Sequence, residues 1–441
     1  MDAGQLTRVC GLWRWLVATA CSALLLGSGQ PVHADEDGYV PGEVLVKLAS
    51  VSDLPAISAA FNLSLLGQFG SRPIYRMAIG DGMPPPVKAD ALRNDSRVVY
   101  AEPNYIGQIP EGRGKRNPWV IGGDAGTVAA QWAPGAIRLS EAHGVHRGAG
   151  VVVAVLDTGV DASHPALAGR LVTGYDFVDD DADPREEGDR SNFGFGHGTH
   201  VAGLVALVAP EARIMPVRVL NPEGMGNVWV LAEALSYAVD PDGNPATDDG
   251  ARVINMSLGT TRRTDLLDDI VKEVTCTDDD EGEGEDDDDR CARTGGVVVV
   301  AAAGNQGNEI MHYPAAEGVN GLLAVAASNE SRRLADFSTR GSWVHIAAPG
   351  ENIYSTVPGG AYGVWSGTSM AAPIVAGAAA LLRGADSSLT ADAVAQRLTS
   401  TSSELCATPL RQLDVAAALS GSPAPGGMPC QMAIPLMVFS P

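Results

Sequence analysis

The middle and later parts of the chain alternate between short hydrophobic runs and longer amphipathic stretches. The hydrophobic runs contain few polar interruptions, which is typical of strands buried on both faces of a parallel sheet. They cover residues 150–156, 212–220, 253–258, 297–303, 322–327 and 344–347. Stretches with helical periodicity lie between them, at residues 198–208, 228–239, 266–274 and 370–382. This alternation predicts an α/β domain, a mostly parallel sheet with helices on both faces.

A shorter pattern of strands and helices precedes that domain, between Tyr39 and Tyr105. Strand-like segments at 43–48, 74–79 and 98–100 alternate with helical segments at 54–61 and 89–93. The order β-α-β-(β)-α-β predicts a small α+β unit with a ferredoxin-like topology. The following segment, Ile109–Gly126, is rich in Gly, Pro and basic residues and is typical of a linker. It contains a candidate cleavage site, Gly114-Lys115-Arg116.

The first 34 residues have the features of a secretory signal. Basic residues precede the apolar run Leu16–Leu26, and small residues flank His33 before the expected cut after Ala34. The run is shorter than the roughly 20 apolar residues that cross a membrane, although a membrane anchor remains the alternative. We expect a secreted protein, extracellular or periplasmic, without a stable membrane span after processing.

Composition narrows the classes of function. Hydrophobic residues make up 45% of the 441 residues and charged residues 19%, which excludes a mostly disordered chain. The formal net charge of −23 repels nucleic acid and anionic lipid, so we expect no nucleic-acid partner.

Four cysteines lie beyond the signal. They are Cys276, Cys291, Cys406 and Cys430. An even number in an oxidising compartment favours disulfides. Three pairings exist, and proximity in sequence favours Cys276–Cys291 and Cys406–Cys430. The alternative, a zinc site, lacks a C-x-x-C pair.

Three segments of the α/β domain carry the side chains that nucleophilic catalysis needs. Asp157 follows a buried strand, His197 lies between glycines at the start of an apolar helix, and Ser369 begins another helix. A serine hydroxyl becomes a useful nucleophile when a histidine takes its proton. A buried carboxylate fixes the histidine tautomer and stabilises the imidazolium. In parallel sheets, such chemistry gathers at the carboxyl ends of the strands.

A fourth side chain completes this chemistry. Asn305 follows the buried run at 297–303, where its carboxamide is able to donate to the oxyanion of a tetrahedral intermediate. Each of the four residues has a structural alternative when taken alone, as a turn residue or a helix N-cap. Together they predict acyl transfer.

The residues around these four positions form recognisable blocks. The blocks are Asp157-Thr-Gly-Val-Asp161, His197-Gly-Thr-His-Val-Ala-Gly203, Ala302-Ala-Gly-Asn305 and Gly367-Thr-Ser-Met-Ala-Ala-Pro373. In this order they resemble the signatures of the subtilisin-like serine proteases, the subtilases of peptidase family S8. The likeness covers residues 131–420. It implies that Asp157 orients His197, that His197 is the base for Ser369, and that Asn305 binds the oxyanion.

The same resemblance implies where a substrate binds. The segment Asn255–Gly259 is similar to the substrate-binding strand of the family. The pocket for the residue before the scissile bond is then expected between two short segments. One contains Ser257, Leu258 and Gly259, and the other contains Ala303 and Gly304.

The resemblance also implies how the chain is organised. The unit at 35–108 looks like the inhibitory propeptide of the family, which binds its own protease. We expect a signal peptide (1–34), that propeptide (35–108), a linker with the maturation site (109–130), a catalytic domain (131–420) and a tail (421–441). The expected protein is a monomeric serine endopeptidase, made as a zymogen, that cuts proteins or peptides.

Acidic insertions raise the question of metal binding. They lie at residues 179–189, 240–250 and 276–291. One interpretation is calcium or another cation, and the other is solvated acidic loops. The resemblance implies that one calcium site of the family is absent, because Ala166 replaces an Asp there. We expect no cofactor to be required for the chemistry, and the identity of any metal stays open.

Other classes of function fit less well. Asp157-Thr158-Gly159 matches the D-T-G of aspartic proteases, but the sequence has no second D-T-G or D-S-G to share a proton. A serine esterase typically has G-x-S-x-G, which differs from the residues around Ser369. The remaining alternative is a non-catalytic, acidic, cation-binding protein on a subtilisin-like scaffold.

Overall fold

The computed structural model describes residues 38–112, 118–244, 247–277 and 285–423. The expected signal peptide, the candidate cleavage site at 114–116, Cys430 and most of the tail lie outside these residues. The interpretations of those segments, including the Cys406–Cys430 pairing, therefore stay predictions.

The first described residues form an α+β unit, referred to below as the N-terminal unit. Its strands are antiparallel and lie in the order β2-β3-β1-β4. Alternate residues of β1, Val44, Val46 and Leu48, are buried against the two helices. Leu45, which points to the opposite face, is also fully buried, in a cluster with residues of α7 (Val228–Val239) and α8 (Asp265–Thr275). The elements are β1 (Tyr39–Leu48), η1 (Val51–Asp53), α1 (Leu54–Phe61), β2 (Leu63–Gln68), β3 (Ile74–Ile79), α2 (Pro85–Leu92) and β4 (Val98–Gln108).

The second part is built on a nine-stranded sheet in the order β16-β17-β13-β12-β11-β10-β6-β8-β7. All neighbouring strands are parallel except β16 and β17. The fully buried strands are those that the hydrophobic runs predicted. The nine strands of the whole sheet are β6 (Val152–Asp157), β7 (Tyr175–Asp176), β8 (Arg213–Arg218), β10 (Val253–Met256), β11 (Val298–Ala302), β12 (Leu322–Ser328), β13 (Ile346–Pro349), β16 (Ser403–Glu404) and β17 (Arg411–Gln412).

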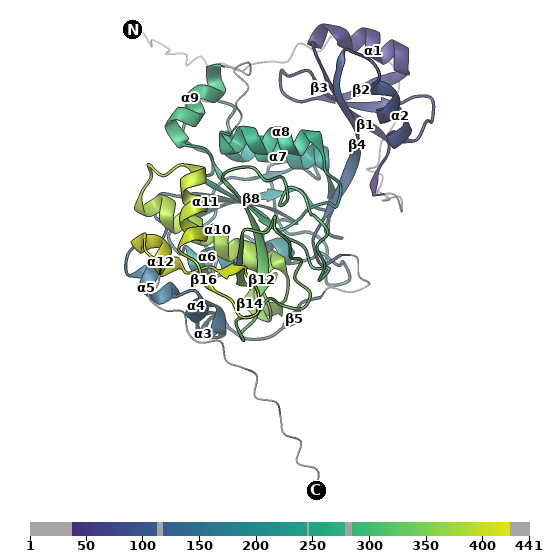
Figure 1. The fold of residues 1–441 in the computed structure, drawn as a ribbon. Coiled ribbons are helices and arrows are strands. Elements are labelled where there is room, and N and C mark those ends of the chain that lie inside the picture. The colour runs from purple at the N-terminus through teal and green to yellow at the C-terminus, as the bar shows by residue number, and fades with distance from the viewer. Residues whose placement is uncertain (1–37, 113–117, 245–246, 278–284, 424–441) are drawn as a thin grey trace, which may run out of the picture. The chain divides into compact units, whose positions relative to one another are not determined.

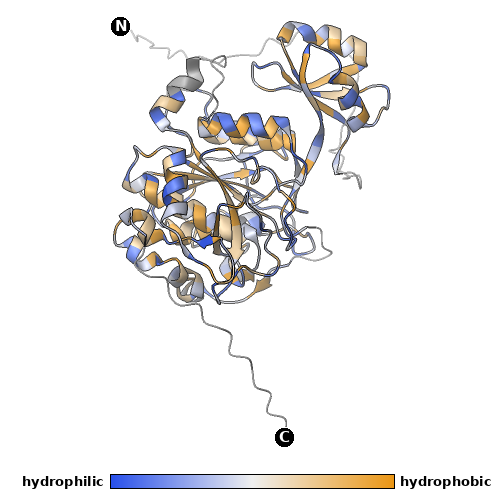
Figure 2. Ribbon diagram, viewed as in Figure 1, coloured by the Kyte–Doolittle hydropathy of each residue, from blue (hydrophilic) through white to orange (hydrophobic). Residues whose placement is uncertain are grey.

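Helices cover both faces of this sheet (Figure 1). Helices α6 (His197–Val208), α10 (Thr368–Ala385) and α11 (Ala391–Ser400) pack on one face, and α7 (Val228–Val239) and α8 (Asp265–Thr275) on the other. Helix α8 has a hydrophilic and a hydrophobic side (Figure 2). The remaining elements are β5 (Val120–Ile121), α3 (Ala125–Ala130), α4 (Trp132–Ala136), α5 (Leu139–His143), β9 (Met225–Asn227), α9 (Glu285–Thr294), β14 (Ile353–Val357), β15 (Ala361–Trp365) and α12 (Val415–Ser420).

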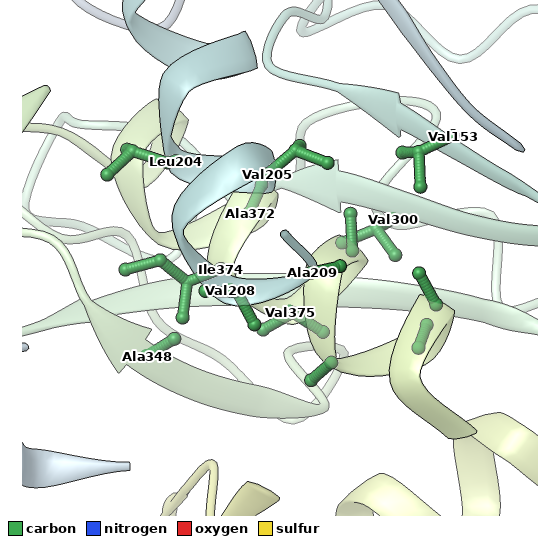
Figure 3. Close-up of a cluster of buried hydrophobic side chains, with 14 of the residues drawn as sticks. Val153, Leu204, Val205, Val208, Ala209, Val300, Ala348, Ala372, Ile374 and Val375 are labelled. Carbon is green, nitrogen blue, oxygen red and sulfur yellow. The ribbon is translucent and has the colours of Figure 1, made fainter. Parts of the chain in front are cut away.

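The packing of α6 against α10 fixes two helix starts that matter for the site. Side chains of both helices interdigitate over the sheet, with Val205 and Val208 beside Ala372 and Val375 (Figure 3). A Cβ added at Gly377 would lie 2.6 Å from Val208 Cβ. The two helices therefore approach closely, and a larger residue at 377 would separate them. By length and composition α10 is apolar enough to span a membrane, but it is almost wholly buried in this core.

Strand β4 belongs to both parts of the molecule. Its first residues pair with β1, while Ile106, Gly107 and Gln108 pair antiparallel with β9. Glu102 and Asn104 of the same strand accept hydrogen bonds from the first turns of α8 and α7. The N-terminal unit is thus joined to the second part by backbone pairing and by two helix caps.

The described residues of the segment 109–130 form several contacts with the α/β part. Ile109 is fully buried, and the indole of Trp119 is buried and donates to Phe195 O at 2.7 Å. Strand β5 pairs with β15. On both sides of residues 113–117, this segment packs against the α/β part.

Cys276 and Cys291 form a disulfide that closes the acidic segment 276–291. Cys276 ends α8 with a positive φ of 59°. The bond therefore ties the end of α8 to α9 across a loop of 15 residues.

Candidate active site

The end of β6 and the start of α6 bring Asp157 and His197 together. Asp157 is the last residue of β6, and His197 is the first residue of α6. Asp157 Oδ1 lies 2.7 Å from His197 Nδ1, and both side chains are fully buried. The N–H of Thr158 donates to the same carboxylate oxygen at 2.8 Å. This contact fixes the ring so that Nε2 faces away from the carboxylate.

An aromatic side chain, Trp365, packs against the imidazole of His197. The ring of Trp365 meets His197 edge-on, with 5.1 Å between centroids. His200, one turn of α6 further on, lies near the same indole, and its Nε2 is 3.2 Å from Ile353 O. Burial lowers the pKa of His200 to about 3, so it is neutral and structural rather than a second base.

Ser369 lies in the first turn of α10. Its carbonyl accepts a hydrogen bond from Ser257 Oγ at 2.9 Å, which links the helix start to the segment after β10. The side chain of Asn305 approaches from the end of β11. Its Oδ1 accepts from the N–H and the hydroxyl of Thr368, at 2.8 and 2.9 Å. These two contacts fix the amide flip and leave Nδ2 available as a donor.

A residue that the sequence did not indicate, Glu111, occupies the space between these groups. Ser369 Oγ donates to Glu111 Oε2 at 3.1 Å, and His197 Nε2 is 3.5 Å from the same oxygen. The Glu111 side chain is only 7% exposed. Within the described residues His197 Nε2 has no hydrogen-bond partner. The Glu111 carboxylate therefore accepts the Ser369 hydrogen bond that a histidine base would need to accept.

The two carboxylates decide the charge of His197. Burial lowers the pKa of the imidazole, but Asp157 and Glu111 outweigh it and raise that pKa to about 10. The ring is therefore an imidazolium at neutral pH, with Asp157 on one nitrogen and Glu111 near the other. In this charge state it has no lone pair with which to take a proton.

Glu111 reaches this place because the chain before it lies along the expected substrate strands. Gln108 and Gly259 exchange both backbone hydrogen bonds at 2.9 Å. The next N–H, of Ile109, donates to Gly224 O at 3.0 Å. The carbonyl of Pro110 accepts from Gln306 Nε2 at 3.4 Å. The segment thus runs as a strand between residues 224–226 and Gly259.

The expected pocket residues lie around this segment. Leu258 is buried in the core, while Gly259 pairs with Gln108. Ala303 is fully buried, and the N–H of Gly304 donates to Thr368 Oγ1 at 3.1 Å. A Cβ at Gly304 would meet the ring of His312, 2.9 Å from Nε2. A hydrogen bond to Thr368 therefore connects Gly304, in one expected wall of the pocket, to the first turn of α10, which carries Ser369.

Comparison with known proteins agrees with this geometry. Residues 148–419 match the model of the subtilase family of serine peptidases. The chain belongs to the subtilase family. Residues 28–104 of this subtilase match the fervidolysin N-terminal prodomain. The predicted family, α/β fold and prodomain are confirmed, and the protein is a serine protease.

Individual relatives span most of the subtilase. It is 35% identical over 372 residues to a thermophilic serine proteinase of Bacillus sp. (strain AK1), covering 80% of each chain. It is 40% identical to thermitase of Thermoactinomyces vulgaris, over 57% of this chain and 81% of that one. Fervidolysin of Fervidobacterium pennivorans superimposes with a TM-score of 0.68 at 25% identity, over 88% of this chain and 62% of fervidolysin.

The acidic segments of the subtilase differ in what they contact. In the first, Asp179 and Glu187 pair with the buried Arg218, together with Asp176 of β7. In the second, carboxylate oxygens of Asp240, Asp242 and Asp249 lie within 4.8 Å of one another. Residues 278–284 of the third segment lie outside the described residues. Among the described residues, only the second therefore offers a set of carboxylates that fits a cation.

Proposed function

We propose that this subtilase is a secreted endopeptidase made as a zymogen, whose own segment 106–111 occupies its substrate cleft. The observation that carries the proposal is the position of Glu111, between Ser369 and His197 at the end of a strand paired with Gly259. A segment held in this way excludes protein and peptide substrates. The exported state is supported by the secretory pattern of residues 1–34.

In the proposed mature enzyme the N-terminal unit and Glu111 have left. His197 then loses one of its two carboxylate neighbours, so the pKa of the imidazole falls and Nε2 is free to take the Ser369 proton. Ser369 Oγ attacks the scissile carbonyl, and Asn305 Nδ2 donates to the oxyanion that forms. His197 passes the proton to the leaving amine while Asp157 stabilises the imidazolium. Water then hydrolyses the acyl-enzyme by the reverse proton path.

The hydrogen-bond partners of the Ser369 hydroxyl and of the Pro110 carbonyl support the inhibited state. The hydroxyl of Ser369 is bound to Glu111, and the carbonyl of Pro110 accepts from Gln306 rather than from Asn305. A nucleophile and a carbonyl held by other partners are not in attack geometry. The segment therefore binds as an inhibitor and not as a substrate.

Cations have no part in the proposed chemistry. The proposed reaction needs only Asp157, His197, Ser369 and Asn305. A calcium ion at Asp240, Asp242 and Asp249 would be structural, because these residues follow α7, whereas the four proposed catalytic residues follow β6 and β11 or begin α6 and α10.

The test is expression of wild type beside Ser369→Ala, with chain mass and casein hydrolysis followed together. We expect wild type to lose its N-terminal unit and to hydrolyse casein, and Ser369→Ala to do neither. The new N-terminus locates the maturation site. Hydrolysis of casein by both chains would contradict the role of Ser369. Two full-length, inert chains would favour the non-catalytic scaffold.

A further inference from the structure

Glu186, in the first acidic segment, reaches into the active site. Its Oε1 accepts a hydrogen bond from Thr158 Oγ1 at 2.7 Å. Its Oε2 accepts from the N–H and the hydroxyl of Thr199, at 3.1 and 2.8 Å. The N–H of Gly196 also donates to this carboxylate. One carboxylate therefore binds both the residue after Asp157 and the first turn of α6.

Helix α6 has no N-cap side chain of its own, because Gly196 occupies that position. The first N–H groups of a helix have no intrahelical partner, and a cap side chain normally accepts from one of them. Glu186 accepts from two such groups, those of Gly196 and Thr199. Burial raises the pKa of Glu186 to about 7, and in its ionised form the carboxylate lies at the positive end of the helix dipole. The helix that carries His197 is therefore capped from outside by the acidic segment.

The two threonines connect this cap to the end of β6. While Thr158 Oγ1 donates to Glu186, it accepts from the N–H of Gly198 at 3.0 Å. Thr199 Oγ1 in the same way accepts from the N–H of Asp161 at 3.0 Å. A hydroxyl that gives its single proton to a carboxylate keeps its lone pairs for N–H donors. Glu186 thus orients both hydroxyls, and each then bridges α6 and the turn that follows β6.

The backbone packing leaves little room for any other arrangement. Gly159 has a φ of 107°, and a Cβ there would collide with the carbonyl of Arg185. The N–H of Val160 donates to Pro184 O at 3.0 Å. The segment that carries Glu186 is therefore packed directly on the turn that follows Asp157.

We propose that Glu186 is a positioning residue for the Asp157–His197 pair, acting through Thr158 and Thr199 and touching no substrate. The inference rests on the proposed roles of Asp157 and His197. Without the carboxylate, the hydroxyls lose their fixed orientation and α6 loses its cap. The start of α6 then moves relative to β6, and small displacements of a catalytic group are costly. The first acidic segment thereby acts in catalysis rather than in cation binding.

The primary test compares Glu186→Gln with Glu187→Gln in the matured enzyme. Both changes remove one charge from the same segment, but Glu187 pairs with Arg218 and Arg185 instead. Active sites are counted with a serine-directed fluorophosphonate, so that folding losses do not enter kcat. We expect Glu186→Gln to lower kcat by about tenfold to a hundredfold with KM within about twofold. Glu187→Gln keeps kcat within about twofold. An unchanged kcat per active site in Glu186→Gln overturns the inference.

A second pair of variants keeps the test decisive if Glu186→Gln does not fold. Thr158→Ser keeps the bridging hydroxyl, and Thr158→Val removes it at similar volume. We expect kcat near wild type for the first and a loss of about tenfold or more for the second. If Glu186 acts through Thr158, the fold loss of kcat in the double variant Glu186→Gln, Thr158→Val is smaller than the product of the fold losses of the two single variants. A fold loss equal to that product overturns the proposed route through Thr158.

A spectroscopic readout separates positioning from general stability. In the full-length Ser369→Ala chain, the Nδ1 proton of His197 shared with Asp157 gives a low-field NMR resonance. We expect Glu186→Gln to shift or broaden it and Glu187→Gln to leave it unchanged. Equal spectra overturn the inference. Loss of wild-type activity on Ser369→Ala tests the proposed function separately.

Discussion

Ser369 Oγ donates its hydrogen bond to Glu111 Oε2 at 3.1 Å, across 258 positions of sequence. The contact replaces the serine–histidine hydrogen bond that the proposed mechanism requires. The Glu111 carboxylate, together with Asp157, also raises the pKa of His197. One carboxylate therefore lies against both the proposed nucleophile and the proposed base.

The first prediction concerns this carboxylate. Glu111→Gln keeps the shape of the side chain but removes its charge, so the pKa of His197 falls and the zymogen state weakens. A hydrogen bond to a charged group contributes roughly 1.5–3 kcal/mol, so we expect loss of the N-terminal unit to be at least about tenfold faster. Chain mass followed over time measures this. Glu141→Gln, at a surface ion pair, is the control, and equal rates for both would contradict the role of Glu111.

A second prediction concerns pH and Glu102. Burial raises the pKa of this carboxyl to about 8 where β4 is docked on α8, against 4.5 for a free glutamate. The docked form therefore holds a proton that the released form gives up, and docking weakens as pH rises from about 4.5 to about 8. We expect the Tm of the Ser369→Ala chain to fall over this range. Glu102→Gln is expected to flatten the dependence of Tm on pH over this range. An unaltered slope would contradict the role of Glu102 in this pH dependence.

The charge of His197 gives a third prediction. In the Ser369→Ala chain Glu111 stays in place, so the ring titrates near pH 10. Adding Glu111→Gln removes the second carboxylate, and the pKa of His197 falls. Because the raised pKa favours the docked form below it, docking also weakens as pH rises through about 10. NMR titration of the histidine ring protons measures both chains, and identical midpoints would exclude the effect.

Asn305→Ala tests the oxyanion donor. Its amide is oriented by Thr368 and has no other assigned task, so we expect folding to be kept and kcat to fall. For such a donor in subtilisin the loss is about 10²–10³ in kcat. Steady-state kinetics on a peptide substrate give kcat and KM separately. A change confined to KM would show that Asn305 binds the ground state instead.

Removal of the described disulfide tests stability. The double change Cys276→Ser, Cys291→Ser opens a loop of 15 residues, for which the chain-entropy model gives about 3 kcal/mol. We expect a lower free energy of unfolding in denaturant, with activity of the folded enzyme retained, because the bond lies at the end of α8. Stability equal to wild type would mean that the acidic loop is constrained by other contacts.

Chelation tests the cation interpretation of Asp240, Asp242 and Asp249. If calcium occupies the cluster, excess chelator lowers the Tm of wild type, and Asp242→Asn removes that response. Thermal unfolding with and without chelator provides the measurement. An unchanged wild-type Tm identifies the segment as a solvated acidic loop.

The elements that sequence predicted well are those with a strong one-dimensional pattern. Helix α7 begins and ends where its hydrophobic pattern does, because Asn227 caps it and accepts from the N–H of Val230. Strand β2 lacks such a pattern, because most of its residues are exposed at a sheet edge and show no alternation. A hydrophobic pattern predicts a helix or strand only where burial of the element requires hydrophobic residues at regular positions.

The site was predictable to the same extent. Asp157, His197, Ser369 and Asn305 lie at or within three residues of the end or start of a buried element, and the order of strands then brings these ends to one edge. Glu111 lies in a segment rich in Gly and Pro, so local sequence gave no signal that its carboxylate lies against Ser369. Its place depends on the pairing of Gln108 with Gly259, a contact between residues distant in sequence.

Strand β4 has a kinetic consequence. Because its last three residues pair with β9 while its earlier residues pair with β1, a cut beyond residue 108 breaks the covalent link but no hydrogen bond of either ladder. The severed unit then behaves as a tight product whose departure sets the rate at which activity appears. The first free enzyme molecules are able to digest units released by others, so activity is expected to rise after a lag and then accelerate with enzyme concentration.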